Sequence, residues 1–275
     1  MMKITGVILV LVALAGGVVL FESSGKEDAL KINEIIEKTM KSIKSTTVLS
    51  FTFTRFERIN GKMESGSSDI KLETNPFKLY LKTLGPDGGQ ELEYGIKGGN
   101  KAVIKPNAFP FITLRLDPFN SLLRDKQHHT IFEIGFTYFG KIMTSFSQKI
   151  NYRYKDFCTI DGDVEWKGRE CISVSCNYPQ FAYVKYIVKK DETLTSIASR
   201  LNLSDYMMLE KNSETVDDYD DLDENEEILI PNLYCKKIIF YVDKENFLPI
   251  RQLIYDDLGL FEEYQYFNLL MPQNN

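Results

Sequence analysis

The stretch Tyr186-Ile187-Val188-Lys189-Lys190-Asp191-Glu192-Thr193-Leu194-Thr195-Ser196-Ile197-Ala198 divides this chain into two kinds of sequence. Its first residues alternate as in a short strand, and Thr193 is suited to cap a helix with apolar residues at 3.6-residue spacing. A second helix is expected from Ser204 to near Asn212. Ile228 to Ile230 then predicts a second strand, which Pro231 ends because proline has no N–H to donate. The sequence therefore predicts a small strand, helix, helix, strand unit.

This unit resembles the LysM domain, a small glycan-binding module of cell-wall proteins. The likeness lies in Tyr186-x-Val188-Lys189-Lys190, Ile197-Ala198, Ile228-x-Ile230-Pro231 and the residues of the expected groove. It implies binding of peptidoglycan or another N-acetylglucosamine-containing glycan between the loop after the first strand and the loop before the last. The groove residues implied by the resemblance are Asp191, Glu192, Thr193, Leu194 and Asn212. An alternative is a LysM scaffold that has lost sugar binding and serves as a spacer or protein contact.

The composition is that of an ordinary globular protein. Of 275 residues, 43% are hydrophobic and 26% are charged, which is enough apolar material for a substantial core. The 33 basic and 39 acidic residues give a net charge of −6. This balance argues against a nucleic-acid partner, because the phosphates of nucleic acids need a basic face.

The first 25 residues predict a targeting segment. Lys3 precedes an apolar run from Ile4 to Phe21, and small residues follow at 23–25. The run fits a signal peptide, and it is also just long enough for an uncleaved anchor in the inner membrane. Both alternatives place the rest of the chain outside the cytoplasm, in the periplasm or an equivalent compartment.

The remaining sequence predicts two helices and a long antiparallel meander. An amphipathic helix is expected over 28–44 and a second over the later part of 118–149, with apolar residues at 131, 134, 138, 142 and 146. Six strands are expected between Thr47 and Leu116, separated by turn signals. Strands are also expected at 151–160, 170–177, 236–242, 250–255 and 260–267. Because each strand has one apolar face, the sheet needs a cover.

This arrangement resembles the outer-membrane lipoprotein carriers (LolA-like) and related envelope proteins of unknown function. The closing run from Gly259 to Leu269, after Leu248-Pro249-Ile250, and the run Gly168-Arg169-Glu170-Cys171 carry that resemblance. It implies an α+β fold: an antiparallel incomplete β-barrel wrapped around helices, with a small inserted βααβ domain. The expected organisation is a leader or anchor over 1–25, a half-barrel over 26–183 and 233–275, and a LysM-like insert over 184–232.

Cysteine and histidine are the residues that most often carry chemistry. We expect Cys158 and Cys171 to face each other across a hairpin turn at Asp161-Gly162, and Cys176 and Cys235 to tie the base of the insert; buried free thiols are the alternative. His128 and His129 are expected to be surface or boundary residues, because adjacent side chains do not converge on one atom. The acidic run 217–227 lacks the spacing of a calcium loop and predicts a solvated loop. No metal site, cofactor or catalytic motif is indicated.

The sequence predicts a non-catalytic envelope protein. A sheet with an aromatic-rich apolar face and only two covering helices is expected to leave a cavity for a lipid or a lipoprotein acyl chain. The candidate lining residues are Phe51, Phe53, Leu79, Leu81, Leu92, Tyr94, Ile112 and Leu114. One alternative is that these side chains fill a solid core, in a peptidoglycan-associated scaffold or regulator without a lipid. A wall hydrolase is a more remote alternative.

Overall fold

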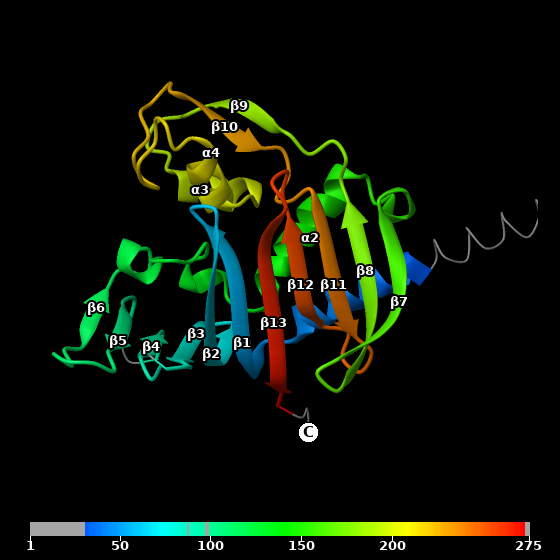
Figure 1. Cartoon of the computed structure of the whole chain (residues 1–275), viewed down its shortest axis with the longest axis horizontal. Helices are drawn as coiled ribbons and strands as arrows, with labels where there is room; N and C mark the ends of the chain where they lie inside the picture. Colours follow the sequence, from blue (N-terminus) through cyan, green and yellow to red (C-terminus); the bar gives the residue numbers. More distant parts are fainter. Residues whose placement is uncertain (1–30, 87, 97–98, 273–275) are drawn as a thin grey trace, which may run out of the picture.

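The computed structural model describes residues 31–86, 88–96 and 99–272, so the predicted leader or anchor over 1–25 lies outside the described residues. The chain forms an α+β fold, as predicted: one antiparallel sheet of eleven strands and a separate two-stranded sheet. The large sheet runs across the whole molecule, two helices lie on one of its faces, and the small sheet with two short helices sits at one end of its strands (Figure 1).

The first half of the large sheet is a six-stranded meander, which confirms the prediction from the turn signals. Alternate residues of its first strand, such as Leu49 and Phe51, are buried, because one face of the sheet is covered. Each strand pairs with the next one along the chain. The strands are β1 (Val48–Ile59), β2 (Lys62–Thr74), β3 (Phe77–Thr83), β4 (Glu91–Tyr94), β5 (Ala102–Lys105) and β6 (Leu114–Leu116).

The second half completes the sheet by pairing the last strand with the first. β13 lies between β1 and β12, so the two ends of the meander meet in the centre of the sheet. β8 and β11 are hydrogen-bonded neighbours although the two-stranded unit separates them in the chain. The strands are β7 (Cys158–Trp166), β8 (Arg169–Asn177), β11 (Lys237–Asp243), β12 (Pro249–Tyr255) and β13 (Leu260–Leu270).

Two helices cover the sheet. Residues 31–45 are helical, and the stripe of Ile32, Ile36 and Ile43 is buried as the sequence predicts. The second helix, α2 (Phe136–Lys149), begins later than its apolar pattern suggests. Gly135 has a φ of +92° at its N-cap, and Ile131 belongs to a 3₁₀ turn, η2 (Ile131–Glu133). Two further 3₁₀ turns are η1 (Ser121–Leu123) and η3 (Tyr154–Asp156). No described helix is both long enough and apolar enough to cross a membrane.

The segment between β8 and β11 has the predicted element order of strand, helix, helix, strand. It consists of β9 (Tyr183–Ile187), α3 (Leu194–Leu201), α4 (Asp205–Lys211) and β10 (Glu227–Pro231), and β9 pairs with β10. Its own core includes Leu194, Ile197 and Met208. However, Tyr206 and Met207 of α4 are buried in the core of the large sheet. The second helix is therefore shared between the two cores.

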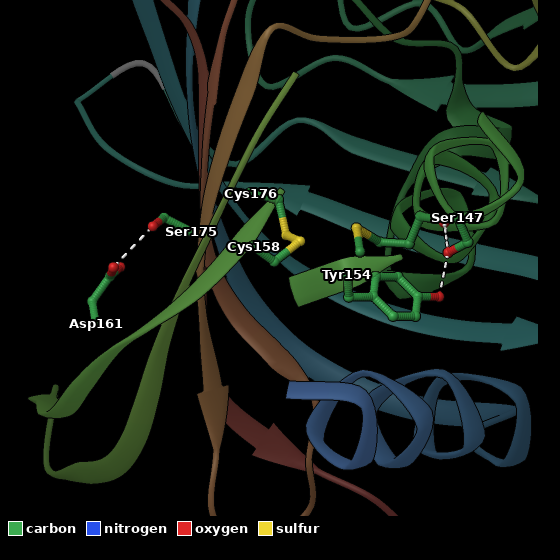
Figure 2. The surroundings of a disulfide bond; sticks show 7 residues. Ser147, Tyr154, Cys158, Asp161, Ser175 and Cys176 are labelled. Carbon is green, nitrogen blue, oxygen red and sulfur yellow. Dashed lines mark hydrogen bonds between the residues drawn. A yellow bond between two sulfur atoms is a disulfide. The ribbon is translucent and has the colours of Figure 1, made fainter. Parts of the chain in front are cut away.

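The disulfide differs from both predicted pairings. Cys158 is bonded to Cys176 (Figure 2), whereas Cys171 and Cys235 are buried free thiols. The error lies in the turn, because the chain reverses at Lys167-Gly168 and not at Asp161-Gly162. Lys167 and Gly168 both have positive φ values, as the two central residues of a tight hairpin turn require. Asp161-Gly162 instead lies at a register shift within β7, so Cys158 faces Cys176 across the β7–β8 pair.

We expect this disulfide to contribute about 3 kcal/mol to stability, because it closes a loop with a sequence separation of 18. Replacing Cys158 and Cys176 together by alanine is predicted to lower the unfolding free energy by that amount, measured in urea. Adding a reductant to this variant should then have no further effect. Cross-linked peptides that contain Cys171 or Cys235 in a non-reducing digest would contradict the assignment.

Candidate functional site

A cavity of about 370 Å³ lies between the covered face of the large sheet and the segment that includes α2. Its walls come from β1, β2, β3, β4, β5, β12 and β13 on the sheet side, and from residues 122–142 on the other side. About half of the lining residues are apolar or aromatic. They are Phe53, Leu81, Leu84, Leu92, Ile104, Leu122, Leu123, Ile131, Ile134, Tyr138, Phe139, Ile142, Ile254, Tyr264 and Tyr266.

The predicted lining residues divide into three groups. Phe53, Leu81 and Leu92 line the cavity. Phe51 and Leu79 are buried in the core and not in the cavity wall, and Tyr94 packs with Phe77 and Phe132 at its edge. The prediction was wrong for Ile112 and Leu114, which are exposed. Ile112 precedes β6, and β6 has a partner on one side only, so the covering layer does not reach these two residues.

A second hollow of about 440 Å³ lies near Leu49, Leu72 and Leu270. Its wall includes no residue of α2. The smaller cavity is therefore the better candidate for an apolar ligand, because it alone combines the inner face of the sheet with the covering helix.

One end of the 370 Å³ cavity is polar. Arg55 and Glu57, at the end of β1, both line it, and Arg55 Nη1 lies 2.9 Å from Glu57 Oε2. The Glu57 carboxylate also accepts a hydrogen bond from the Tyr264 hydroxyl at 2.7 Å and from the His128 backbone N–H at 3.1 Å. The Arg55 guanidinium lies across Gly66, where an added Cβ would come within 3.3 Å of it. This end of the cavity therefore has its charges paired in place.

His128 is buried, which corrects the prediction that both histidines are surface or boundary residues, whereas His129 does lie at the boundary. His128 is fully buried and the side chain of His129 is only 14% exposed. They converge on one atom, Oε1 of the fully buried Glu262, at 2.7 Å from His128 Nδ1 and 3.2 Å from His129 Nε2. The Tyr234 hydroxyl donates to the same carboxylate at 2.8 Å. The second nitrogen of His129 lies 3.3 Å from the Glu133 carboxylate.

These contacts set the charges of the cluster. Burial by itself raises the pKa of Glu262, but the charge of His129 and the hydrogen bond from His128 outweigh it and lower this pKa to about 2. Burial lowers the pKa of His129, yet the charge of Glu262 and the hydrogen bond to Glu133 outweigh burial and raise it well above 6.5. His128 Nε2 lies 2.9 Å from the Arg58 carbonyl oxygen, so each nitrogen of this ring faces a hydrogen-bond acceptor.

The same cluster reaches the inserted segment. The His128 ring is stacked between Tyr206 of α4 and Phe261 of β13, with centroid distances of 4.2 and 4.3 Å. Beside it, Arg124 makes a buried ion pair with Asp205 at 2.8 Å. One histidine of the pair therefore faces the insert, and the other lines the cavity.

The predicted glycan-binding residues are mostly engaged within the insert. Leu194 is buried, and the Asn212 side chain makes hydrogen bonds with the backbone of Met208 and Leu229. Thr193 caps α3, and Glu192 accepts hydrogen bonds from Tyr186 and Arg200. Asp191 is exposed. The loop after β9 and the loop before β10, which the resemblance predicts to form the groove, do lie side by side. The Leu194 N–H donates a hydrogen bond to the Tyr219 carbonyl at 2.8 Å.

Neither of the two free cysteines lines the cavity. Burial raises the pKa of the Cys171 thiol to about 11 and also raises that of Cys235, so neither is a thiolate near neutral pH. Within the described residues, no group of three or more histidine, cysteine, aspartate or glutamate side chains is arranged to hold a metal ion. The fold and the cavity thus define a class: an antiparallel half-barrel that holds a partly apolar cavity under its covering helix.

The particular family follows from the sequence. The profile of the family described as "Protein of unknown function (DUF1571)" matches residues 48–203, more than half of the chain, and the chain belongs to this family. The match includes β1 to β9 and α3, and it ends before α4. A comparison with curated proteins found no match.

Several solved structures are similar to this one at low identity. Lipoprotein LppX of Mycobacterium tuberculosis is 10% identical with a TM-score of 0.42, and the alignment covers 89% of this chain and 97% of that chain. LprF from Mycobacterium bovis is 12% identical with a TM-score of 0.43, covering 90% and 98%. A LolA superfamily protein from Nitrosomonas europaea is 9% identical with a TM-score of 0.27, covering 88% and 94%. At these values the likeness carries no conclusion about what this chain binds.

The buried cluster predicts a specific pH dependence of stability. Glu262 contributes stability that is present above its ordinary pKa of 4.5 and is lost as the pH falls toward about 2. His129 contributes stability that is complete below its ordinary pKa of 6.5 and is lost as the pH rises through its higher folded value. The variant His129→Gln should lose the alkaline slope. It should also unfold at a higher pH on the acid side, because the pKa of Glu262 then rises.

Urea unfolding at a series of pH values measures both slopes. Lys101→Gln, which breaks the exposed pair of Lys101 with Asp117, is the control and should leave the profile unchanged. Identical profiles for His129→Gln and the unmodified protein would show that the imidazolium is not coupled to Glu262.

Proposed function

We propose that this chain is a non-catalytic protein of the cell envelope that holds the acyl chain of a lipid or lipoprotein in the 370 Å³ cavity. The observation that supports this is the cavity itself, walled by Phe53, Leu92, Ile142 and other apolar side chains of the sheet and α2. Transfer of an acyl chain from water into such a space gains about 0.8 kcal/mol per buried CH₂. At roughly 30 Å³ per small group, the volume suits a segment on the order of ten methylenes.

The polar end of the cavity supports an amphiphilic ligand. Gln127, Thr130 and Ser68 line the cavity with neutral donors and acceptors, while Arg55 and His129 already have carboxylate partners there. A ligand with a hydrogen-bonding head group would leave that group at this end and place its chain among the apolar side chains. This division of the wall is typical of sites for small amphiphiles.

The disulfide supports an extracytoplasmic location. Cys158 and Cys176 are bonded, and disulfides persist mainly in oxidising compartments such as the periplasm. A leader or anchor over residues 1–25 is part of this proposal, with the periplasm as the compartment. Non-enzymatic binding is also part of it, because, of the charged side chains described in the cavity wall, all but Asp125 are held in ion pairs; these are Arg55, Glu57, His129 and Glu133.

A cavity-filling variant tests the proposal. Leu81→Phe with Ile142→Phe places two larger side chains in the cavity, and we expect it to weaken binding of a fluorescent fatty acid at least tenfold. Ile112→Phe makes the same kind of change at an exposed position and is the control. Binding is followed by fluorescence titration, and thermal melting confirms that both variants are folded.

The alternative to lipid binding is a scaffold whose interior stays empty of ligand. In that case the unmodified protein would carry no lipid in denaturing mass spectrometry after purification from its own envelope. It would also fail to bind the fluorescent fatty acid. Equal binding by the cavity-filling variant and the unmodified protein would place the ligand elsewhere.

We also propose that residues 184–232 form a LysM-like domain that binds peptidoglycan or a related N-acetylglucosamine-containing glycan. The element order β9, α3, α4, β10 and the adjacent loops around Asp191 and Tyr219 support this proposal. Against it stands the internal use of Glu192, Thr193 and Asn212, which leaves Asp191 and backbone groups to meet a sugar. The acidic run 217–227 would repel anionic wall polymers.

Retention on purified peptidoglycan tests this second proposal. Deleting the insert is unsuitable, because α4 is part of the host core. Asp191→Gly is preferable, since Asp191 has a φ of +61° that glycine accepts without strain. We expect this variant to be retained several-fold less than the control Glu214→Ala, measured by co-sedimentation. Equal sedimentation of the unmodified protein with and without peptidoglycan would exclude the glycan role.

A further inference from the structure

Six large apolar side chains are exposed around the free edge of the sheet. We call them the edge patch: Phe109 (87% exposed), Phe111 (66%), Ile112 (59%), Leu114 (40%), Phe119 (55%) and Leu122 (68%). They lie between β5 and the end of η1, around β6, at one end of the molecule (Figure 1). Scattered exposed leucines are ordinary, but six large apolar side chains exposed within residues 109–122, three of them phenylalanines, indicate an interaction surface.

The edge patch is continuous with the cavity. Leu122 belongs to the patch and also lines the cavity, and Leu84, itself exposed, lines the cavity as well. An acyl chain moving between the outside and the cavity would therefore stay in contact with apolar side chains. A patch at this position can contact the surface that donates the ligand to the cavity or receives the ligand from it.

The charge around the patch differs from that of the whole chain. Residues 101–126 contain five basic and two acidic residues, whereas the chain has 33 basic and 39 acidic. Three of these cations are paired: Lys101 with Asp117, Lys105 with Glu91 and Glu93, and Arg124 with Asp205. Arg115 and Lys126 have no ionic partner among the described residues. This local excess of positive charge complements an anionic surface.

We propose that the edge patch docks on an anionic lipid bilayer. Phe109 and Phe111 flank Pro110 on a protruding loop, and a bilayer accepts such side chains without a matching pocket. In this orientation Arg115 and Lys126 lie near the lipid head groups. Because Leu122 belongs to both the patch and the cavity wall, the cavity then faces the membrane on the side of Leu122. The docking itself rests only on the patch and its charge, and the passage of an acyl chain into the cavity rests on the function proposed above.

An indole placed in the loop reports insertion directly, even if residues 1–25 anchor the chain. The full chain with Phe109→Trp is mixed with vesicles of phosphatidylglycerol and phosphatidylcholine, and the emission of the native Trp166 is subtracted. We expect a blue shift on addition of vesicles and several-fold more quenching by brominated lipid than for Leu258→Trp, an exposed control on the β12–β13 turn. Arg115→Gln with Lys126→Gln should reduce the shift, and vesicles of phosphatidylcholine alone should give a smaller one.

Two results would overturn the proposal. One is quenching at position 109 no greater than at position 258. The other is a blue shift that appears without vesicles and grows with protein concentration, which would make the patch a contact between copies of this chain.

Binding of a soluble fluorescent fatty acid without vesicles separates this inference from the proposed function. Phe109→Ser with Phe111→Ser should leave that affinity unchanged, because neither residue lines the cavity. The same two substitutions in a Phe119→Trp reporter, which lies in the patch and outside the cavity wall, should abolish quenching by brominated lipid. Loss of quenching with intact fatty-acid binding supports docking through the patch. Failure of the unmodified protein to bind the fatty acid would remove the proposed function and leave the docking result standing.

Discussion

The buried carboxylate of Glu262 is the point on which the rest of the structure depends. It lies on β13, in the centre of the sheet, and its hydrogen-bond donors come from the segment before α2 and from the segment that returns from the insert. A buried anion without partners costs several kcal/mol, so the folded chain must bring all these donors together. One carboxylate thereby fixes how three distant parts of the sequence meet.

The cavity follows from this arrangement. The segment carrying His128 and His129 is held against the sheet at Glu262, and α2 starts only at Phe136 after Gly135. The layer opposite the sheet therefore consists of loop and 3₁₀ turns as well as the first half of α2. The space left between them and the sheet is the site, and its polar end is the side nearest the charged cluster.

Much of the fold could be predicted from local patterns, and most of the site could not. Alternation at Leu49, Phe51 and Phe53 predicts β1, and turn residues predict the meander. The histidine cluster depends on Glu262, which is 134 residues from His128, and no local spacing reports such a contact. The disulfide was missed because Asp161-Gly162 has the composition of a turn while the structure uses it as a bulge. Ile112 was wrongly predicted to line the cavity, because sequence periodicity shows that one face of a strand is apolar but does not show whether another element covers that face.

Helix α4 has one further consequence. Met208 faces the small core of the insert and Met207, its neighbour, is buried in the large core, so a single helix of seven residues belongs to both. A module built this way has no independent melting transition, because its loss would uncover the larger body as well. Because Tyr206 and Met207 are part of the large core, transfer of this segment to another protein would also require changes in the host residues that pack against α4.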